Sequence, residues 1–285
     1  KGMSEGLNPP FIRVTGRLLI NAASLNAQGG AGTNYIEITK IPVVINKGDE
    51  RLLVEVPAIS GNMIKHYHFA NFVDHLAQAG WGEKLTKEAL NKKVAYRFER
   101  GKTTTTPSGS TVELEDEAKI ISAFADADLH GFLAPDTQVR RESLAKFSFA
   151  LPVEEDIFEE QVVVEAITHN RVVIDDQGRI PGEGEMMIFK RQYTSALYGF
   201  SILLDLPYIG VPLSNLTLPP QLSDEERKAR IRAAITALAD TLLGRMGANT
   251  SRALPVARVE EVVAVASPIP LPPAVHGFFK GYLKE

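Results

Sequence analysis

The stretch Val56–His66 constrains the fold of this chain more than any other. An apolar run ends at Pro57, and Ser60 is a residue type favoured at a helix N-cap, just before an amphipathic pattern. The stretch therefore predicts a strand, a tight connection and then a helix over residues 61–79. The free amides of the first helical turn, with Gly61 permitting close approach, form a natural seat for a phosphate.

Three polar residues, Asn62, Lys65 and His66, share one face of this helix with the apolar Phe69 and Phe72. The apolar side chains would hold that face against a sheet, so the polar ones should emerge at the end of the sheet beside the free amides. An ordinary capped helix, in which Lys65 extends along apolar surface to reach water, explains the same pattern. The sequence leaves both interpretations open.

Composition and charge narrow the functional classes. The 285 residues are 44% hydrophobic, enough for one or two domains with a sizeable core. A formal net charge of −4 excludes a generally basic nucleic-acid binder, so any such site must be a local gathering of Lys and Arg. The absence of cysteine excludes disulfides, thiolate zinc sites and cysteine nucleophiles. Because no apolar run suits a membrane span or a signal segment, we expect a cytoplasmic protein with no membrane partner.

The segment Phe11–Leu25 alternates in a way that is typical of a β-strand. One side is apolar, whereas the other carries Arg13, Thr15, Arg17 and Asn21. This alternation predicts a sheet that is covered on one face only. The Gly-rich loop that follows lacks the third glycine of a dinucleotide-binding fingerprint, so we expect no such cofactor.

The rest of the chain predicts an α+β fold. A capping box at Ser223–Glu226 opens a second helix, which should run to about Gly244 with Ile235 on its core face. Two widely separated helices among many strands favour a sheet with helices on one face. Further strands are expected at about 36–45, 51–58, 143–151, 161–167 (buried), 186–193, 199–206 (buried) and 259–265.

Enzyme motifs are mostly missing. The chain has no Walker A loop, no G-x-S-x-G elbow and no H-E-x-x-H pair. Asp126, Asp128 and His130 would share one face of a strand and could hold a divalent ion. Since a metal centre needs a fuller ligand set, we favour a surface turn there and predict neither a metal nor a cofactor.

Basic and polar residues are scattered over the ends of several predicted elements. Together with a one-sided sheet and a long hairpin at 165–192, they favour binding of a single strand through its phosphates, without sequence reading. The aromatic signature of sequence-reading RRM domains is absent. The predicted contacts are Arg17, Asn21, Ser60, Asn62, Lys65, His66, Arg140, Arg141, His169, Asn170, Arg171, Arg245 and Arg252.

Several short motifs occur in an ordered series that spans nearly the whole chain. The series resembles the DevR-type backbone subunit of type I CRISPR effector complexes, most like the archaeal type I-A branch of the RAMP superfamily. The motifs are Gly16–Asn21, Pro57–His66, Arg140–Ser143 with Phe147 and Ser148, His169–Arg171 and Ser251–Pro255.

This resemblance implies one elaborated domain over residues 1–285. Its ferredoxin-like (RRM-type) antiparallel core, the palm, would carry finger elements inserted at about 81–135 and a thumb hairpin at about 165–192. Copies would stack head-to-tail along a crRNA guide, with other Cascade subunits as partners. Protein would grip phosphates and 2′-hydroxyls, which leaves the bases to pair with target DNA.

The resemblance also implies a non-catalytic subunit, and two other functions stay open. A RAMP-type endoribonuclease that processes the precursor guide without metal would use His66 or His169 as its general base. A DNA-binding regulator is the third possibility, although the chain lacks a helix-turn-helix pattern.

Overall fold

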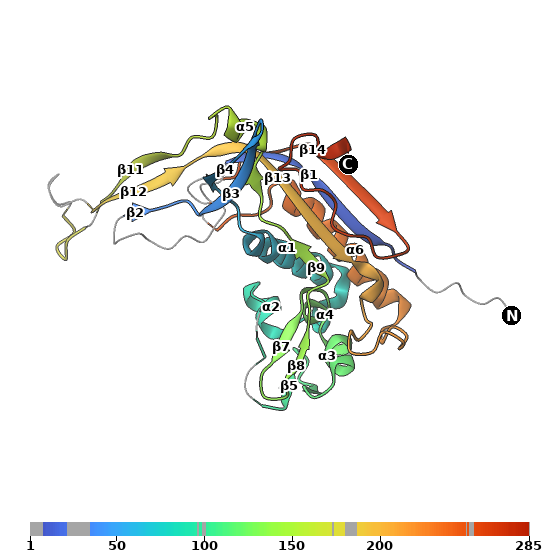
Figure 1. The fold of residues 1–285 in the computed structure, drawn as a ribbon. Coiled ribbons are helices and arrows are strands. Elements are labelled where there is room, and N and C mark those ends of the chain that lie inside the picture. Colours follow the sequence, from blue (N-terminus) through green and yellow to red (C-terminus); the bar gives the residue numbers. More distant parts are fainter. Residues whose placement is uncertain are drawn as a thin grey trace.

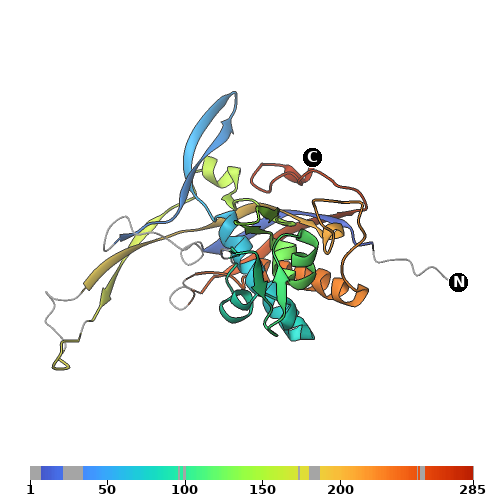
Figure 2. The ribbon, with the colours of Figure 1, turned by 90° about the horizontal axis from the view of Figure 1, so that it is seen from below.

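In this computed structural model the chain forms one body around a central sheet, and two β-ribbons project from it (Figures 1 and 2). No helix among the described residues is long and apolar enough to cross a membrane. The described residues are 8–21, 35–95, 97–98, 101–172, 174–179, 187–248, 250 and 254–284.

The central sheet is antiparallel, with strand order β10-β13-β1-β14, and β9 also pairs with β13. The two long inner strands pair along their whole length, from Phe11 opposite Asp205 to Asn21 opposite Ser195. These observations confirm an α+β fold built on antiparallel strands. The strands are β1 (Phe11–Asn21), β9 (Ala145–Phe147), β10 (Leu151–Pro152), β13 (Ser195–Asp205) and β14 (Ala257–Ser267).

Helices α1 (Gly61–Leu76) and α6 (Asp224–Leu242) pack together and share the main core with one face of this sheet (Figure 1). Both begin where the sequence predicts, because the hydroxyl oxygens of Ser60 and Ser223 accept hydrogen bonds from the third amide of each helix at 3.1 and 3.2 Å. The predicted core face of α6 is partly wrong: Ile235 is 43% exposed. Small residues face the core instead, which lets α6 lie close to α1; they include Ala233, Ala234 and Ala237.

The prediction of a one-sided sheet is wrong, because residues 268–282, the C-terminal strap, cover the other face. Main-chain oxygens of the strap accept hydrogen bonds from side chains on the face of β1 that was predicted to be exposed. Arg13 Nε donates to Leu271 O at 2.7 Å, and Thr15 Oγ1 donates to Val275 O at 2.7 Å. Arg13 and Thr15 are consequently buried.

Two glycines, Gly199 of β13 and Gly277 of the strap, allow the strap to touch the backbone of the sheet. A Cβ atom on Gly199 would lie 2.2 Å from Gly277 C, and one on Gly277 would lie 2.1 Å from Gly16 O. Separations of this kind are impossible for real side chains, so the crossing exists only because Gly199 and Gly277 both lack one. The strap is thus a fitted layer of the fold.

One ribbon consists of β3 (Lys40–Lys47) and β4 (Glu50–Pro57), and the other joins β11 (Glu165–Arg171), β12 (Met187–Tyr193) and the short β2 (Tyr35–Ile36). The segment 161–167 was predicted to be a buried strand, but Ile167 is 49% exposed. The reason is that β11 belongs to a ribbon that extends away from the body (Figure 2).

A smaller lobe with its own hydrophobic cluster lies below the sheet in Figure 1. Its elements are α2 (Lys87–Lys92), β5 (Thr103–Thr105), β6 (Thr111–Glu113), α3 (Glu117–Ala123), α4 (Ala125–His130), β7 (Phe132–Ala134) and β8 (Val139–Arg141). Short helical segments elsewhere are Ala77–Trp81 (a π-turn), Gly82–Lys84, α5 (Glu154–Phe158), Leu206–Tyr208 and Tyr282–Lys284.

We expect Gly199→Ala to destabilise the fold by about 1–3 kcal/mol, because the added methyl group meets backbone atoms that cannot rotate away. Urea unfolding followed by circular dichroism measures the change. Gly82→Ala is the matched control, since its φ is −58° and its nearest new contact would be an ordinary 3.6 Å. Equal stability of the two variants would show that the strap does not need the close crossing.

Candidate nucleic-acid interface

The start of α1 is fixed to the sheet. Ile59 N donates to Ala150 O at 3.0 Å, and Ala150 N donates back to Ile59 O at 2.9 Å. A Cβ atom on Gly61 would lie 2.4 Å from Phe147 O, so this glycine admits the neighbouring strand rather than a ligand. The sequence interpretation of Gly61 is thereby corrected, while the capped helix start itself is present.

Beside this helix start, the three predicted polar residues lie at the surface. Asn62 and His66 are exposed, and Lys65 is partly buried. Burial lowers the pKa of Lys65 from its ordinary value, and no carboxylate among the described residues offsets that loss of hydration. A partly desolvated ammonium group without an anion favours a negatively charged ligand, since such a ligand would restore the lost interaction.

Under Lys65 lies a buried pair of histidines that joins three elements. His68 Nε2 lies 2.9 Å from Ala234 O, and His68 Nδ1 lies 2.9 Å from His130 Nε2. A carbonyl can only accept, so His68 carries its proton on Nε2 and accepts from His130. Burial lowers the pKa of His68 to about 4 and that of His130 well below its ordinary value. Both rings are therefore neutral links between α1, α4 and α6.

The acidic residues near His130 are also used within the fold. They are buried residues of helix α4, so both the shared face of a strand and the favoured surface turn are wrong predictions. Asp126 accepts from Thr86 N at 2.9 Å, and Asp128 pairs with two arginines. Within the described ranges, no group of three His, Asp or Glu side chains is placed to hold a metal ion.

Arg141 was predicted to contact RNA, but its guanidinium is fully buried. It pairs with Glu117 Oε1 at 2.7 Å and with Asp128 Oδ1 at 2.8 Å, and it donates to three backbone carbonyls as well. The Arg141 donors are therefore used in contacts inside the protein, and we no longer count this residue among the predicted RNA contacts. Its neighbour Arg140 is exposed, as a ligand-binding residue must be.

Other predicted contacts are engaged too. Arg17 pairs with Glu155 at 3.1 Å and donates to the strap at Gly277 O, so we also remove it. The side-chain oxygen of Asn21 accepts from Val256 N at 3.0 Å. Arg245 is half exposed but pairs with two aspartates.

The ribbon brings His169, Asn170 and Arg171 onto one strand, β11. The His169 ring stacks on Phe189, with centroids 5.1 Å apart, and its Nε2 lies 2.8 Å from Tyr193 Oη. Asn170 is exposed. The side chain of Arg171 and all of Arg252 lie outside the described part of the chain.

Sequence reasoning missed one residue of the ribbon, Arg191. Its side chain is 3% exposed, and its Nε has no hydrogen-bond partner among the described residues. It lies opposite Ile167 in the β11–β12 register and beside Ile36 of β2. In the sequence, Arg191 is marked only by its place in a basic pair, Lys190–Arg191, on a strand that begins with the apolar residues Met187, Ile188 and Phe189.

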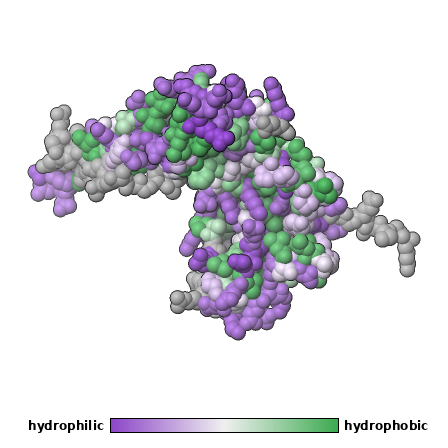
Figure 3. Space-filling view, in the orientation of Figure 1, coloured by the Kyte–Doolittle hydropathy of each residue, from purple (hydrophilic) through white to green (hydrophobic). Residues whose placement is uncertain are grey.

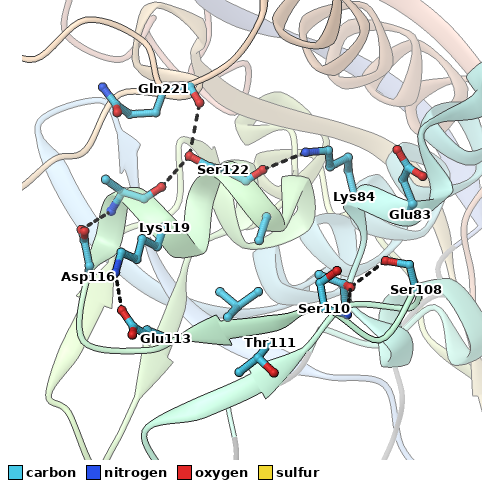
Figure 4. Close-up of a pocket in the computed structure, with 14 residues that line it drawn as sticks. Glu83, Lys84, Ser108, Ser110, Thr111, Glu113, Asp116, Lys119, Ser122 and Gln221 are labelled. Carbon is cyan, nitrogen blue, oxygen red and sulfur yellow. Dashed lines mark hydrogen bonds and ion pairs between the residues drawn. The ribbon is translucent and has the colours of Figure 1, made fainter.

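A cavity of about 820 Å³ opens in the smaller lobe (Figure 4). Its polar groups already satisfy each other: Lys119 pairs with Glu113, Lys84 Nζ donates to Ser122 O at 3.4 Å, and Ser122 Oγ donates to Ala118 O at 2.6 Å. The lower end of the molecule, where this lobe lies, is largely hydrophilic in Figure 3. The arrangement offers no activated nucleophile and no unpaired cation, so we do not place the site here.

Residues 14–285 match the family described as CRISPR-associated negative auto-regulator DevR/Csa2. The chain belongs to this family, which confirms the resemblance read from its motifs. A CRISPR-associated protein Cas7/Cst2/DevR from Methanocaldococcus jannaschii is 50% identical over 278 residues, which cover 96% of this chain and 86% of the relative. A protein of the same description from Thermoproteus tenax is 36% identical, covering 96% and 80%. An aCascade subunit Cas7/Csa2 from Saccharolobus solfataricus is 29% identical, covering 90% and 79%.

Solved structures are more distant. A chain of a CRISPR RNA-guided surveillance complex matches with a TM-score of 0.41 and 9% identity, covering 88% of this chain and 67% of that one. A chain of a pre-nicking complex of the same kind also has a TM-score of 0.41, with 12% identity and coverage of 88% and 77%. Scores at this level carry no argument about the site.

We expect Arg141→Ala to cost about 3–5 kcal/mol of folding free energy, because it removes the guanidinium that pairs with two buried carboxylates, Glu117 and Asp128. The adjacent Arg140→Ala should stay within about 0.5 kcal/mol of the parent, since it removes an exposed side chain. Chemical denaturation of the pair measures both. A parent-like Arg141→Ala protein would mean that the cluster is not needed for folding.

Proposed function

We propose that this chain is a non-catalytic guide-RNA-binding backbone subunit of a type I CRISPR interference complex. The observation that carries the proposal is Lys65, a desolvated cation without a carboxylate partner at the fixed start of α1, in a chain of the DevR/Csa2 family. Asn62 and His66 beside it supply donors for phosphate and 2′-hydroxyl oxygens. The spacer of a guide varies while the protein is constant, so contacts must avoid the bases.

The proposed contact set is smaller than the one read from the sequence. It drops the two arginines, Arg17 and Arg141, whose donors are used inside the protein, and it leaves the bases free to pair with target DNA. Asn21, Arg245 and Arg252 remain secondary candidates. The primary contacts are the α1 start with Ser60, Asn62, Lys65 and His66, then Arg140, and on the ribbon His169, Asn170 and Arg171.

We further propose that the core is ferredoxin-like. Read from its other edge, the sheet has the order β14-β1-β13-β10, with α1 following β1 and α6 lying between β13 and β14 in the chain. Counted along the chain, these are the fourth, first, third and second strands of the core, and this antiparallel order with two helices on one face supports that topology. The lobe at about 81–135 would be the fingers, and the ribbon at about 165–192 the thumb.

Head-to-tail stacking follows from the same proposal. A projecting ribbon with exposed apolar residues, among them Ile167 and Ile188, has surface that the chain itself does not cover. Contact of such a ribbon with a different surface of the next copy is heterologous, and heterologous contacts that do not close give filaments. Other Cascade subunits would bind the ends of this filament on the crRNA, in the cytoplasm.

We expect Lys65→Ala to weaken binding of unrelated single-stranded RNAs by similar factors and to lower the slope of log affinity against log salt by about one. Fluorescence anisotropy with two RNAs of unrelated sequence at several salt concentrations measures this. Lys284→Ala, at an exposed lysine near the C-terminus, is the control and should leave both quantities unchanged. An unchanged slope in a folded Lys65→Ala protein would favour the alternative interpretation, in which Lys65 extends to water and binds no phosphate.

One observation keeps an endoribonuclease as the second candidate: His169 is held between Phe189 and the Tyr193 hydroxyl, as a catalytic ring can be. Cleavage also needs a group that protonates the leaving 5′-oxygen, and the Tyr193 contact occupies one ring nitrogen instead. We therefore expect labelled repeat RNA to remain intact with the purified protein, with or without divalent metal. Multiple-turnover cleavage at one position, lost in His169→Ala, would establish the endoribonuclease.

A further inference from the structure

A second cavity, of about 400 Å³, lies between the end of α1 and the first half of α6. We name it the Trp81 pocket, because Trp81 forms part of its wall. It is separate from the α1 start, since the 16 residues of α1 span roughly 24 Å at 1.5 Å per residue. The volume lies within the range of small-molecule sites and accommodates a nucleobase with its sugar.

Trp81 is held firmly and yet remains accessible. The helical path is kinked at Gly80, whose φ is +89°, a conformation that favours glycine, and the next residue, Trp81, lines the same cavity as residues of α6. The side chain packs against the main core while part of it stays exposed. Trp81 lines the cavity, and among the described residues its indole N–H has no hydrogen-bond acceptor.

Two cations of α6 line the same cavity. Lys228 and Arg232 are exposed, four residues apart and therefore on one face of the helix. Within the described ranges neither forms an ion pair, whereas on the rim His75 Nε2 lies 2.8 Å from Asp240 Oδ2. Glu225 is the one carboxylate in the lining, so the cations outnumber the anions there.

We propose that the Trp81 pocket binds single-stranded nucleic acid at a position distinct from the guide contacts at the α1 start. A base stacks on the indole, and the flanking phosphates contact Lys228 and Arg232. An aromatic platform beside a positive track is the usual design for binding a single strand without reading its sequence. Two cations in successive helical turns match a run of phosphates better than they match an isolated carboxylate of a peptide.

The experiment uses the fact that Trp81 is the only tryptophan of the chain, so selectively excited tryptophan fluorescence reports on this pocket alone. The full-length protein is titrated with oligo(dT) in one arm and oligo(U) in the other. We expect saturable quenching in at least one arm, which then identifies DNA or RNA as the ligand. The double variant Lys228→Ala/Arg232→Ala should weaken the quenching at least tenfold and lower its salt slope by about two.

Two variants separate this proposal from the guide-binding one. Lys65→Ala should weaken RNA binding as measured by anisotropy and leave the quenching isotherm unchanged. The double variant should weaken the quenching and leave the binding measured by anisotropy unchanged. Both changed side chains of the double variant are exposed, so the fold should persist, and Lys284→Ala again serves as the control. The proposal would be overturned by no quenching in either arm, by equal quenching in the parent and the double variant, or by stronger quenching with an acidic peptide.

Discussion

The rest of the structure depends on the buried carboxylate of Asp128. Its two oxygens accept from Arg141 at 2.8 Å, from Arg230 at 2.7 Å and from the amide of Gly210 at 2.9 Å. These partners come from the smaller lobe, from α6 and from the connection after β13, so one side chain fixes three parts of the molecule. A carboxylate buried to this degree is tolerated only because every oxygen is paired with charged or amide donors. Glu117 and Glu226 extend the cluster through the same two arginines.

Contacts inside the protein, in this cluster and elsewhere, use several of the arginines, and these side chains are not available to bind a ligand. Arg141 and Arg230 neutralise the internal carboxylates, Arg13 and Arg17 hold the strap, and Arg245 pairs with Asp74 and Asp240. The strap has a further consequence, because the sheet face that could have taken a nucleic acid is already occupied by protein. The nucleic-acid contacts that we propose are therefore at the ends of α1, at the exposed Arg140 and on the ribbon. A net charge of −4 is compatible with this, since only a local field is needed.

The sequence predicted features that depend on neighbouring residues. Ser60 and Ser223 each cap a helix because the acceptor and the amide it satisfies are three residues apart, and the strand β1 was predicted from the alternation of its own residues. Pairings between distant residues could not be predicted. Arg140 and Arg141 look alike in the chain, and they differ only because Asp128 and Glu117 meet one of them in space. The strap was missed for the same reason: its carbonyls meet Arg13 and Thr15 across more than 250 positions.

The two proposed binding positions also differ in whether neighbouring or distant residues create them. Lys65 could be proposed from the sequence because its setting is the helix start itself, and the structure adds that no carboxylate among the described residues compensates for its burial. The Trp81 pocket could not be found, since it requires α1 and α6, about 150 residues apart, to lie side by side. Both positions depend on α1, whose orientation is fixed by the His68–His130 contact and by Ala234 of α6. A single rigid helix thus sets the distance between the two proposed contacts, so that a strand bound at one end of α1 and a strand bound at the other would keep a constant separation in every copy of a filament.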